Sequence, residues 1–542
     1  MHQSKIEQYS DTPCSSSYRA ELKAARWAVS TAGKLREKFA RERTALKSSA
    51  RDEKPRGHSK RLSPLIQKML DLSDRLPSRS GQTSLTPWLE QVFYVECPLT
   101  IALVAPDFIP RDEICVPAVE AMEKSVQELL DEDGWPHADV LPIFSCLLAS
   151  WYRCWELIKR LKLPFDSQAR SQLEWALRQA LRMRRFDGTL VGDDQHAEKW
   201  TEKDFRHALK LSQDADDKAL VKLLGDGKSM SRKRLQKLPE SSSISEWGTS
   251  GILRSSWNRR ACKLGFRYDN RSFWVELDTS RPLLAGTAMP DVLFDEHKLE
   301  PLEDFEIVCE QRDQEIDYVE FQMPLSQSVT LTRQLILLPA DQVLIIADSV
   351  VANRTGMIDY QCRWPLAAGV EVIEESDTTE IYLANSTIQS LLLPLALSEW
   401  KVDRSAGFLK THASNAPVES ESISDPLKSP NLAADHDQRQ KLLMKFASRG
   451  SAICVPLCFD LDRKRSTKQR TWRRLTVAEN FAPVPSDQAA AFRVQLNKQQ
   501  YLYYRALTNQ GNRTFFGENF AGDFVFSRFK ESGVVKELLR IE

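Results

Sequence analysis

The residues LTRQLILLPADQVLIIADSV, at positions 331–350, carry the strongest fold signal in this chain. Two runs rich in Ile, Leu and Val, 331–338 and 342–350, lie on either side of the turn residues 339–341. This pattern predicts a β-hairpin. Because both strands are apolar on both faces near the turn, we expect them to lie centrally in a two-layer sandwich.

Strand spacing continues on both sides of this hairpin, from Ile252 to the end of the chain. In a later strand, for example, Tyr501 and Tyr503 share one face and Leu502 lies on the other. The residues 405–440 are polar and aperiodic, and they are predicted to form a flexible surface loop. The sequence therefore predicts a large antiparallel β-sandwich over 251–542.

Before about residue 240 the apolar residues recur at helical spacing instead. Leu147, Trp151 and Trp155 define one buried helix face, and Leu173 and Leu177 define another. Proline residues and Asp-Gly pairs separate the expected helices, which cover 18–50, 63–76, 88–104, 118–132, 140–161, 167–185 and 202–224.

A polar segment rich in Gly, Ser and charged residues, 225–250, separates the two kinds of spacing and is predicted to be a linker. The resulting organisation is a basic N-terminal helix and tail in 1–62, an α-helical domain in 63–224, this linker, and the β-sandwich in 251–542. The fold class is α+β and multidomain, as a length of 542 residues also indicates.

Composition excludes several classes of function. The 75 Lys and Arg residues balance the 75 Asp and Glu residues, so no global field attracts nucleic acid or a membrane, and neither is expected as a partner. No stretch is apolar for about 18 residues, and no secretory signal is visible, so we expect a cytoplasmic protein. The ten cysteines stand singly, without a zinc or disulfide pattern, so no metal and no cofactor are expected.

Two segments concentrate chemically useful side chains. The segment 133–139 holds Trp135 and His137, and it either forms a sugar-binding site with Tyr152 and Arg153 or is a structural turn. The segment 463–474 holds seven basic residues around Trp472. It either binds sulfate, uronate or phosphate groups, or pairs with the acidic residues of 294–320.

The order of the two halves, together with three short motifs, resembles the heparinase II/III-like polysaccharide lyases. The motifs are Asp133-Gly134 before the helix of Trp151 and Tyr152, Ile252-Leu253-Arg254 with Trp257, and Arg333-Gln334-Leu335 leading into 344–348. The resemblance implies an N-terminal helical incomplete α/α toroid, a β-sandwich, and a cleft for acidic polysaccharide that is cleaved by β-elimination.

Two hypotheses follow from the resemblance. In the first the protein is a lyase, with Tyr152 as proton donor or base, His137 as its partner, and Arg153 and Arg254 neutralising the substrate carboxylate. Its substrate-binding residues are then Trp135, Trp257, Trp472 and Arg473. In the second the protein is a non-catalytic binding or interaction protein, because the His-rich segment that the family carries after Arg254 is missing and no histidine occurs between His207 and His297.

Overall fold

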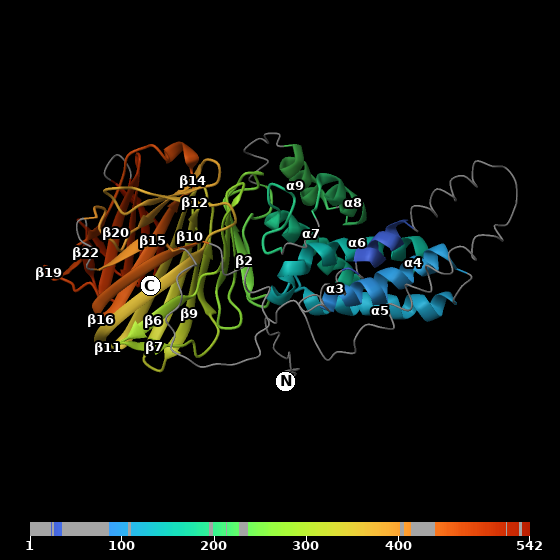
Figure 1. Cartoon of the computed structure of the whole chain (residues 1–542), viewed down its shortest axis with the longest axis horizontal. Coiled ribbons are helices and arrows are strands. Elements are labelled where there is room, and N and C mark those ends of the chain that lie inside the picture. Colours follow the sequence, from blue (N-terminus) through green and yellow to red (C-terminus); the bar gives the residue numbers. More distant parts are fainter. Residues whose placement is uncertain are drawn as a thin grey trace, which may run out of the picture. The chain divides into compact units, whose positions relative to one another are not determined.

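The computed structural model describes residues 23, 26–34, 86–106, 110–193, 199–212, 214–226, 237–401, 406–412, 440–515, 517–529 and 534–542. The chain divides into two compact units, a helical unit up to Pro239 and a β unit from Glu240 (Figure 1). Most of the predicted N-terminal segment 1–62 lies outside the described residues, as do residues 405 and 413–439 of the predicted loop.

Two single turns link helices of the helical unit. A π-helical turn, η1 (Gln91–Glu96), connects α3 (Thr86–Glu90) to α4 (Cys97–Val104), and a 3₁₀ turn, η2 (Ala138–Ile143), leads into α6 (Phe144–Leu161). Besides the helical residues 26–34, the described helices are α3 (Thr86–Glu90), α4 (Cys97–Val104), α5 (Arg111–Leu129), α6 (Phe144–Leu161), α7 (Ser167–Met183), α8 (Glu202–Ser212) and α9 (Ala215–Asp226). The predicted helix faces on α6 and α7 are buried, and α5 and α6 both pack against α7.

The single helix expected over 202–224 is two helices, which corrects the prediction. Asp214 interrupts the run, because its carboxylate accepts a hydrogen bond from the backbone N–H of Asp217 at 2.8 Å. An aspartate in this position caps a new helix rather than continuing the old one.

The described residues of the β unit form four antiparallel sheets. The first sheet has the order β1 (Ser243–Ser245), β2 (Ser250–Arg254), β3 (Lys263–Arg267), β4 (Trp274–Asp278), β5 (Pro282–Thr287). The central sheet follows the path β12 (Glu371–Glu374), β13 (Ile381–Ala384), β14 (Ile388–Pro394), β16 (Lys441–Asp460), β11 (Val343–Pro365), β10 (Val329–Leu338), β9 (Asp317–Ser326), β8 (Glu306–Arg312). Three further strands attach to it, β6 (Pro290–Phe294), β7 (His297–Leu299) and β15 (Gly407–His412).

The remaining strands form a third sheet and a small fourth sheet. The third has the order β17 (Arg470–Leu475), β20 (Ala489–Leu496), β21 (Gln499–Ala506), β24 (Phe524–Phe529), β25 (Val535–Ile541). The fourth has the order β19 (Ala482–Pro483), β18 (Ala478–Glu479), β22 (Arg513–Phe515), β23 (Glu518–Phe520).

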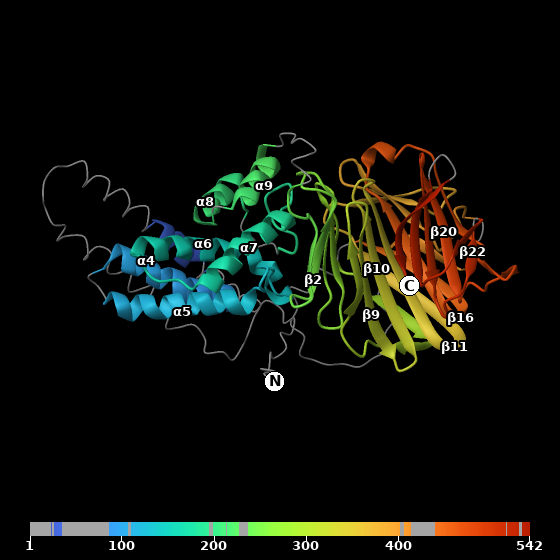
Figure 2. The ribbon, with the colours of Figure 1, turned by 180° about the vertical axis from the view of Figure 1, so that it is seen from behind.

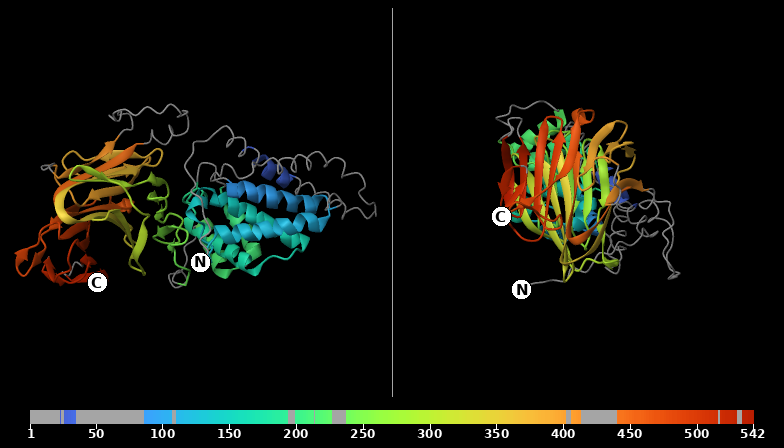
Figure 3. Two further views of the ribbon diagram at one scale, coloured as in Figure 1. Left: turned by 90° about the horizontal axis from the view of Figure 1, so that it is seen from below. Right: turned by 90° about the vertical axis from the view of Figure 1, so that its left-hand side faces the viewer.

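The predicted hairpin is confirmed and forms β10 and β11, which pair in register from Val329 with Ala352 to Leu338 with Val343. Its two faces belong to different cores. Leu335 and Leu337 pack with the first sheet, whereas Ile336 and Leu338 pack with the third sheet. The central sheet is therefore covered on both faces, which adds a layer to the two that were expected, and Figures 2 and 3 show this layering.

Two strands lie in ranges that the sequence assigned to irregular structure. The strand β1 falls inside the predicted linker, because Ile244 packs on the core of the first sheet. The strand β15 falls inside the predicted loop, because Leu409 is buried when β15 pairs with β16. The α+β multidomain fold class is confirmed, and within the described residues no helix is long and apolar enough to cross a bilayer.

Candidate functional site

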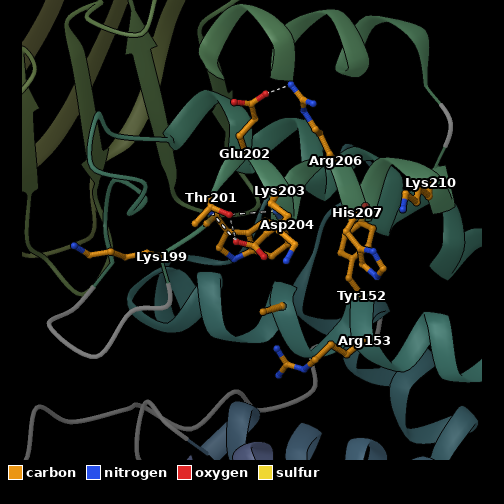
Figure 4. A pocket seen from close by; sticks show the side chains of 13 residues that line it. Tyr152, Arg153, Lys199, Thr201, Glu202, Lys203, Asp204, Arg206, His207 and Lys210 are labelled. Atoms are coloured by element: carbon orange, nitrogen blue, oxygen red, sulfur yellow. Dashed lines mark hydrogen bonds and ion pairs between the residues drawn. The ribbon is translucent and has the colours of Figure 1, made fainter. Parts of the chain in front are cut away.

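A pocket of about 900 Å³ opens in the helical unit between α6 and α8. Figure 4 shows side chains from α8, among them Lys203, His207 and Lys210, near Tyr152 and Arg153 of α6. Two of the predicted catalytic residues, Tyr152 and Arg153, therefore line this pocket. His137 and Trp135 do not belong to its lining.

Local sequence fixes how α8 begins at this pocket. The carboxylate of Asp204 accepts hydrogen bonds from the backbone N–H of Thr201 at 2.8 Å and from its hydroxyl at 2.6 Å. The backbone N–H of Asp204 in turn donates to the hydroxyl of Thr201 at 3.4 Å, which completes the reciprocal pattern of a helix N-terminal capping box. The neighbouring Trp200 is buried and donates from Nε1 to the carbonyl of Ser145, at the start of α6, at 3.0 Å. The cap and this anchor together hold α8 against α6.

The charge of the pocket lining is strongly positive. Among the described residues of the lining, Glu202 and Asp204 are the only carboxylates, against the five cations Arg153, Lys199, Lys203, Arg206 and Lys210 and the imidazole of His207. Glu202 forms an ion pair with Arg206 of the next helical turn, and Asp204 caps the helix. Within the described part of the chain, neither Lys203 nor Lys210 forms a hydrogen bond or an ion pair.

His207 and Arg153 are held by carboxylates of neighbouring helices. The ring Nε2 of His207 lies 2.9 Å from Oε2 of Glu156 on α6. Partial burial acts to raise the pKa of Glu156, but the hydrogen bond to His207 and the charge of Arg160 outweigh it and lower that pKa below its ordinary value. Arg153 donates two hydrogen bonds, of 2.7 and 2.9 Å, to the fully buried Glu96.

Tyr152 is almost fully buried, and its hydroxyl donates to the carbonyl of Leu173 at 2.9 Å. Burial raises the pKa of Tyr152 well above its ordinary value, and the charges of Asp217 and Glu174 raise it further. The phenol therefore stays protonated over the ordinary pH range. Its proton is directed to a backbone carbonyl on α7 rather than into the pocket.

The segment 133–139 is a tight turn that packs on α7. At Gly134, φ is +71°, and a Cβ there would lie 2.2 Å from the backbone nitrogen of Ala176. Trp135 is buried, and its backbone N–H donates to the carboxylate of Asp131 at 2.7 Å. The Nδ1 of His137 accepts from the N–H of Asp139 at 3.3 Å. These contacts describe the structural turn that the sequence left as one of two alternatives.

Arg254 and Trp257 lie in the β unit, at the end of β2 and in the turn that follows. Arg254 is fully buried and donates to the carbonyls of Ser256 at 2.8 Å and Asn258 at 3.1 Å. Its guanidinium lies 5.2 Å from the ring centre of Trp257, which is also buried. The guanidinium is thus built into the turn.

Trp472 and Arg473 occupy opposite faces of β17. Trp472 is in the core between the central and third sheets and donates to the carbonyl of Leu397 at 3.1 Å, whereas Arg473 is exposed. The basic segment 463–474 pairs with other acids than we expected. Arg465 binds Asp460 at 2.6 Å and Arg470 binds Glu380 at 3.0 Å, and no ion pair among the described residues joins this segment to 294–320.

The cations of α8 were missed in the sequence. Their signal was present, because Lys203, Arg206 and Lys210 are spaced by three and four residues and so share one side of a helix. What the sequence did not contain was the packing of α8 on α6, which turns this side into the wall of a pocket.

No protein-family model matches the sequence, and no curated protein matches it either. Solved structures do match. Heparinase III aligns with a TM-score of 0.56 and 12% identity over 92% of this chain and 77% of that one. A mutant heparan sulfate lyase from Pedobacter heparinus aligns with a TM-score of 0.53 and 12% identity over 83% and 70% of the two chains. The structure of a heparinase III gene product aligns with a TM-score of 0.54 and 12% identity over 83% of this chain and 69% of that one. The predicted resemblance in fold is confirmed.

Proposed function

We propose that this protein binds an acidic polysaccharide in the pocket of the helical unit. The observation that supports this most directly is the excess of positive charge in the pocket, whose two carboxylates are already engaged within α8. Sulfate and carboxylate groups are the anions that such clustered Lys and Arg side chains bind. The similar structures include a protein whose name states that it acts on heparan sulfate, an acidic polysaccharide.

We further propose that binding, and not β-elimination, is the function of this pocket. A lyase needs a positioned base and a group that neutralises the uronate carboxylate. The phenol of Tyr152 is engaged with Leu173, and Arg153 is engaged with Glu96. The buried contacts of Arg254 give it a structural role in its own turn. A cytoplasmic location stays a prediction of the sequence.

Calorimetric titration with heparin tests the binding proposal. The double variant Lys203→Gln, Lys210→Gln should bind heparin about tenfold more weakly than wild type, because each lost charged contact contributes roughly 0.5 to 1 kcal/mol at a solvent-exposed site. The matched control is Lys124→Gln, Lys222→Gln, which removes the same charge from exposed positions outside the pocket. Equal affinity of the two double variants would exclude the pocket as the binding site.

Ultraviolet absorbance of the unsaturated product tests the absence of lyase chemistry. Wild-type protein incubated with heparin, and with a sulfate-free uronate polymer, should give no increase in absorbance. An increase that disappears in His207→Asn would show instead that the pocket is catalytic, since His207 is the histidine of its lining and is oriented by Glu156.

A further inference from the structure

Three arginines on three separate turns lie at one end of the β unit, and we call them the arginine corner. Arg260 is in the turn between β2 and β3, Arg281 is in the turn between β4 and β5, and Arg463 begins the 3₁₀ turn η3 (Arg463–Arg465) after β16. The strand register explains their common location. Lys263 pairs with both Arg254 and Asp278, so the first two turns lie at the same end of the first sheet.

Neutral groups hold two of these guanidiniums in place. Arg463 donates from Nη2 to the hydroxyl of Ser280 at 2.6 Å, which connects η3 to the β4–β5 turn. Arg281 donates from Nη1 to Asn385 Oδ1 at 2.8 Å and to Ser386 Oγ at 2.9 Å, in the turn between β13 and β14. Within the described residues, neither Arg281 nor Arg463 forms an ion pair.

The carboxylates within and directly beside these turns are engaged with other groups. Asp278 binds the buried Lys263 at 2.9 Å, and Asp460 binds Arg465 at 2.6 Å. Asp462 accepts from the N–H of Lys464 at 3.1 Å, and its other oxygen lies 3.5 Å from Arg465. These acids therefore leave the positive charge of Arg281 and Arg463 uncompensated.

The positive charges of the corner also act on one another. Burial lowers the pKa of the Arg463 guanidinium, and the charges of Arg260 and Arg281 lower it further. Like charges held together by fixed hydrogen bonds are unfavourable without an anion. The fixed bonds to Ser280, Asn385 and Ser386 also reduce the side-chain entropy that binding must overcome.

We infer that the arginine corner binds a sulfate group of the acidic polysaccharide, an inference that rests on the proposed function. Guanidinium forks match the oxygens of sulfate, carboxylate and phosphate groups. The guanidinium groups of Arg281 and Arg463 are held on two turns that the Arg463–Ser280 hydrogen bond connects, and two such groups suit the tetrahedral oxygens of a sulfate ester better than the two oxygens of one planar carboxylate. The β unit then selects for sulfation.

The test compares heparin with chemically desulfated heparin, which has the same uronate backbone. In calorimetric titrations of the full chain, Arg281→Gln, Arg463→Gln should weaken heparin binding about tenfold or more and change the affinity for desulfated heparin less than twofold. Arg354→Gln, Arg449→Gln is the matched control, because both side chains are exposed arginines of the β unit outside the corner. It should leave both affinities unchanged.

Two further measurements keep the outcome unambiguous. A second double variant, Arg281→Lys, Arg463→Lys, keeps the positive charges but removes the planar guanidinium groups. Its affinity for heparin should lie between those of wild type and the Gln variant. Thermal unfolding of each variant shows whether the β unit remains folded. The sulfate site is excluded if the Gln variant is folded and binds heparin as tightly as the control variant does. It is also excluded if the Gln variant loses affinity for heparin and for desulfated heparin equally. Titration with inorganic polyphosphate tests phosphate as the other tetrahedral anion. If the Gln variant loses affinity for polyphosphate but not for heparin, the corner binds phosphate and the inference is overturned.

The same titrations separate this inference from the proposed function. The pocket variant Lys203→Gln, Lys210→Gln should weaken heparin and desulfated heparin alike. If wild type binds heparin and only the corner variant loses affinity, the pocket proposal fails while the corner stands. If wild type binds neither polymer, both fail.

Discussion

Burial gives Tyr152 and Arg254 structural roles that their chemistry alone does not reveal. Both side chains donate to backbone carbonyls, Tyr152 to Leu173 and Arg254 to Ser256 and Asn258. A donor committed to a buried carbonyl is not free to act on a substrate, because removing it leaves that carbonyl unsatisfied. Substitutions at these positions should therefore change stability before they change binding.

Tyr152→Phe tests this directly. The variant should lower the free energy of unfolding by about 1 kcal/mol, the typical contribution of one buried hydrogen bond, and leave heparin affinity within twofold of wild type. Urea unfolding and calorimetric titration measure the two quantities. A stable variant that no longer binds heparin would show that the hydroxyl acts on the ligand.

Asp317 provides a pH-dependent signature of the β unit. Burial raises its pKa to about 6, although the hydrogen bond from Ser242 acts to lower it. In the unfolded chain an aspartate has a pKa of about 3.9, so between about pH 4 and 6 the folded state binds more protons and stability falls as pH rises. Asp317→Asn should remove that fall and be more stable than wild type at pH 7 by about 2 to 3 kcal/mol.

Urea unfolding from pH 4 to 7 measures this effect, with the exposed Glu306→Gln as the control. If the wild type and Asp317→Asn have parallel pH profiles, Asp317 is not the group responsible.

At the level of helices and strands, the hairpin of β10 and β11 contains a buried ion pair. Arg333 and Asp348 face each other in register, and two hydrogen bonds of 2.7 Å join them. Tyr360 on β11 also donates to Asp348 at 2.6 Å. The pair is fully buried, so either partner left alone is an uncompensated charge in the core.

Asp348→Leu should therefore lower the free energy of unfolding by about 3 to 5 kcal/mol, whereas Asp348→Leu combined with Arg333→Met should be less destabilising than the single change. Chemical denaturation of both variants measures this coupling. Additive losses would mean that the two side chains act independently.

The capped start of α8 connects local structure to the pocket. Thr201→Ala removes the hydroxyl that bonds Asp204, and it should cost about 1 kcal/mol of stability. Hydrogen exchange should become faster in the first turn of α8, and heparin affinity should fall two- to threefold because Lys203 is less well positioned. Unchanged exchange in α8 would show that Trp200 alone fixes the helix.

Helices and strands with long runs of periodic apolar residues could be predicted from the sequence. Sites formed by residues from turns far apart in the chain could not. The hairpin 331–350 is apolar on both faces, and this is the condition for a strand that is covered on both sides. The arginine corner brings together residues 260, 281 and 463, and no pattern in the sequence connects them. Trp135 and Trp472 are both buried in the structure, and a tryptophan that stacks on sugar and one that fills a core have the same local sequence signal.

Across the entire chain, equal numbers of acidic and basic residues conceal local excesses of positive charge. The pocket of the helical unit and the arginine corner of the β unit are two such regions, and their carboxylates are engaged with other groups. With no net charge to attract a polyanion over a long range, the proposed binding depends on these short-range contacts, and salt screens them over about 8 Å at physiological ionic strength.

Heparin affinity should therefore fall steeply as sodium chloride is raised. A plot of log affinity against log salt should have a smaller slope for Lys203→Gln, Lys210→Gln and for Arg281→Gln, Arg463→Gln, since each variant releases fewer counterions on binding. The controls Lys124→Gln, Lys222→Gln and Arg354→Gln, Arg449→Gln should keep the wild-type slope. Equal slopes in all five proteins would place the polyanion on a surface other than these two.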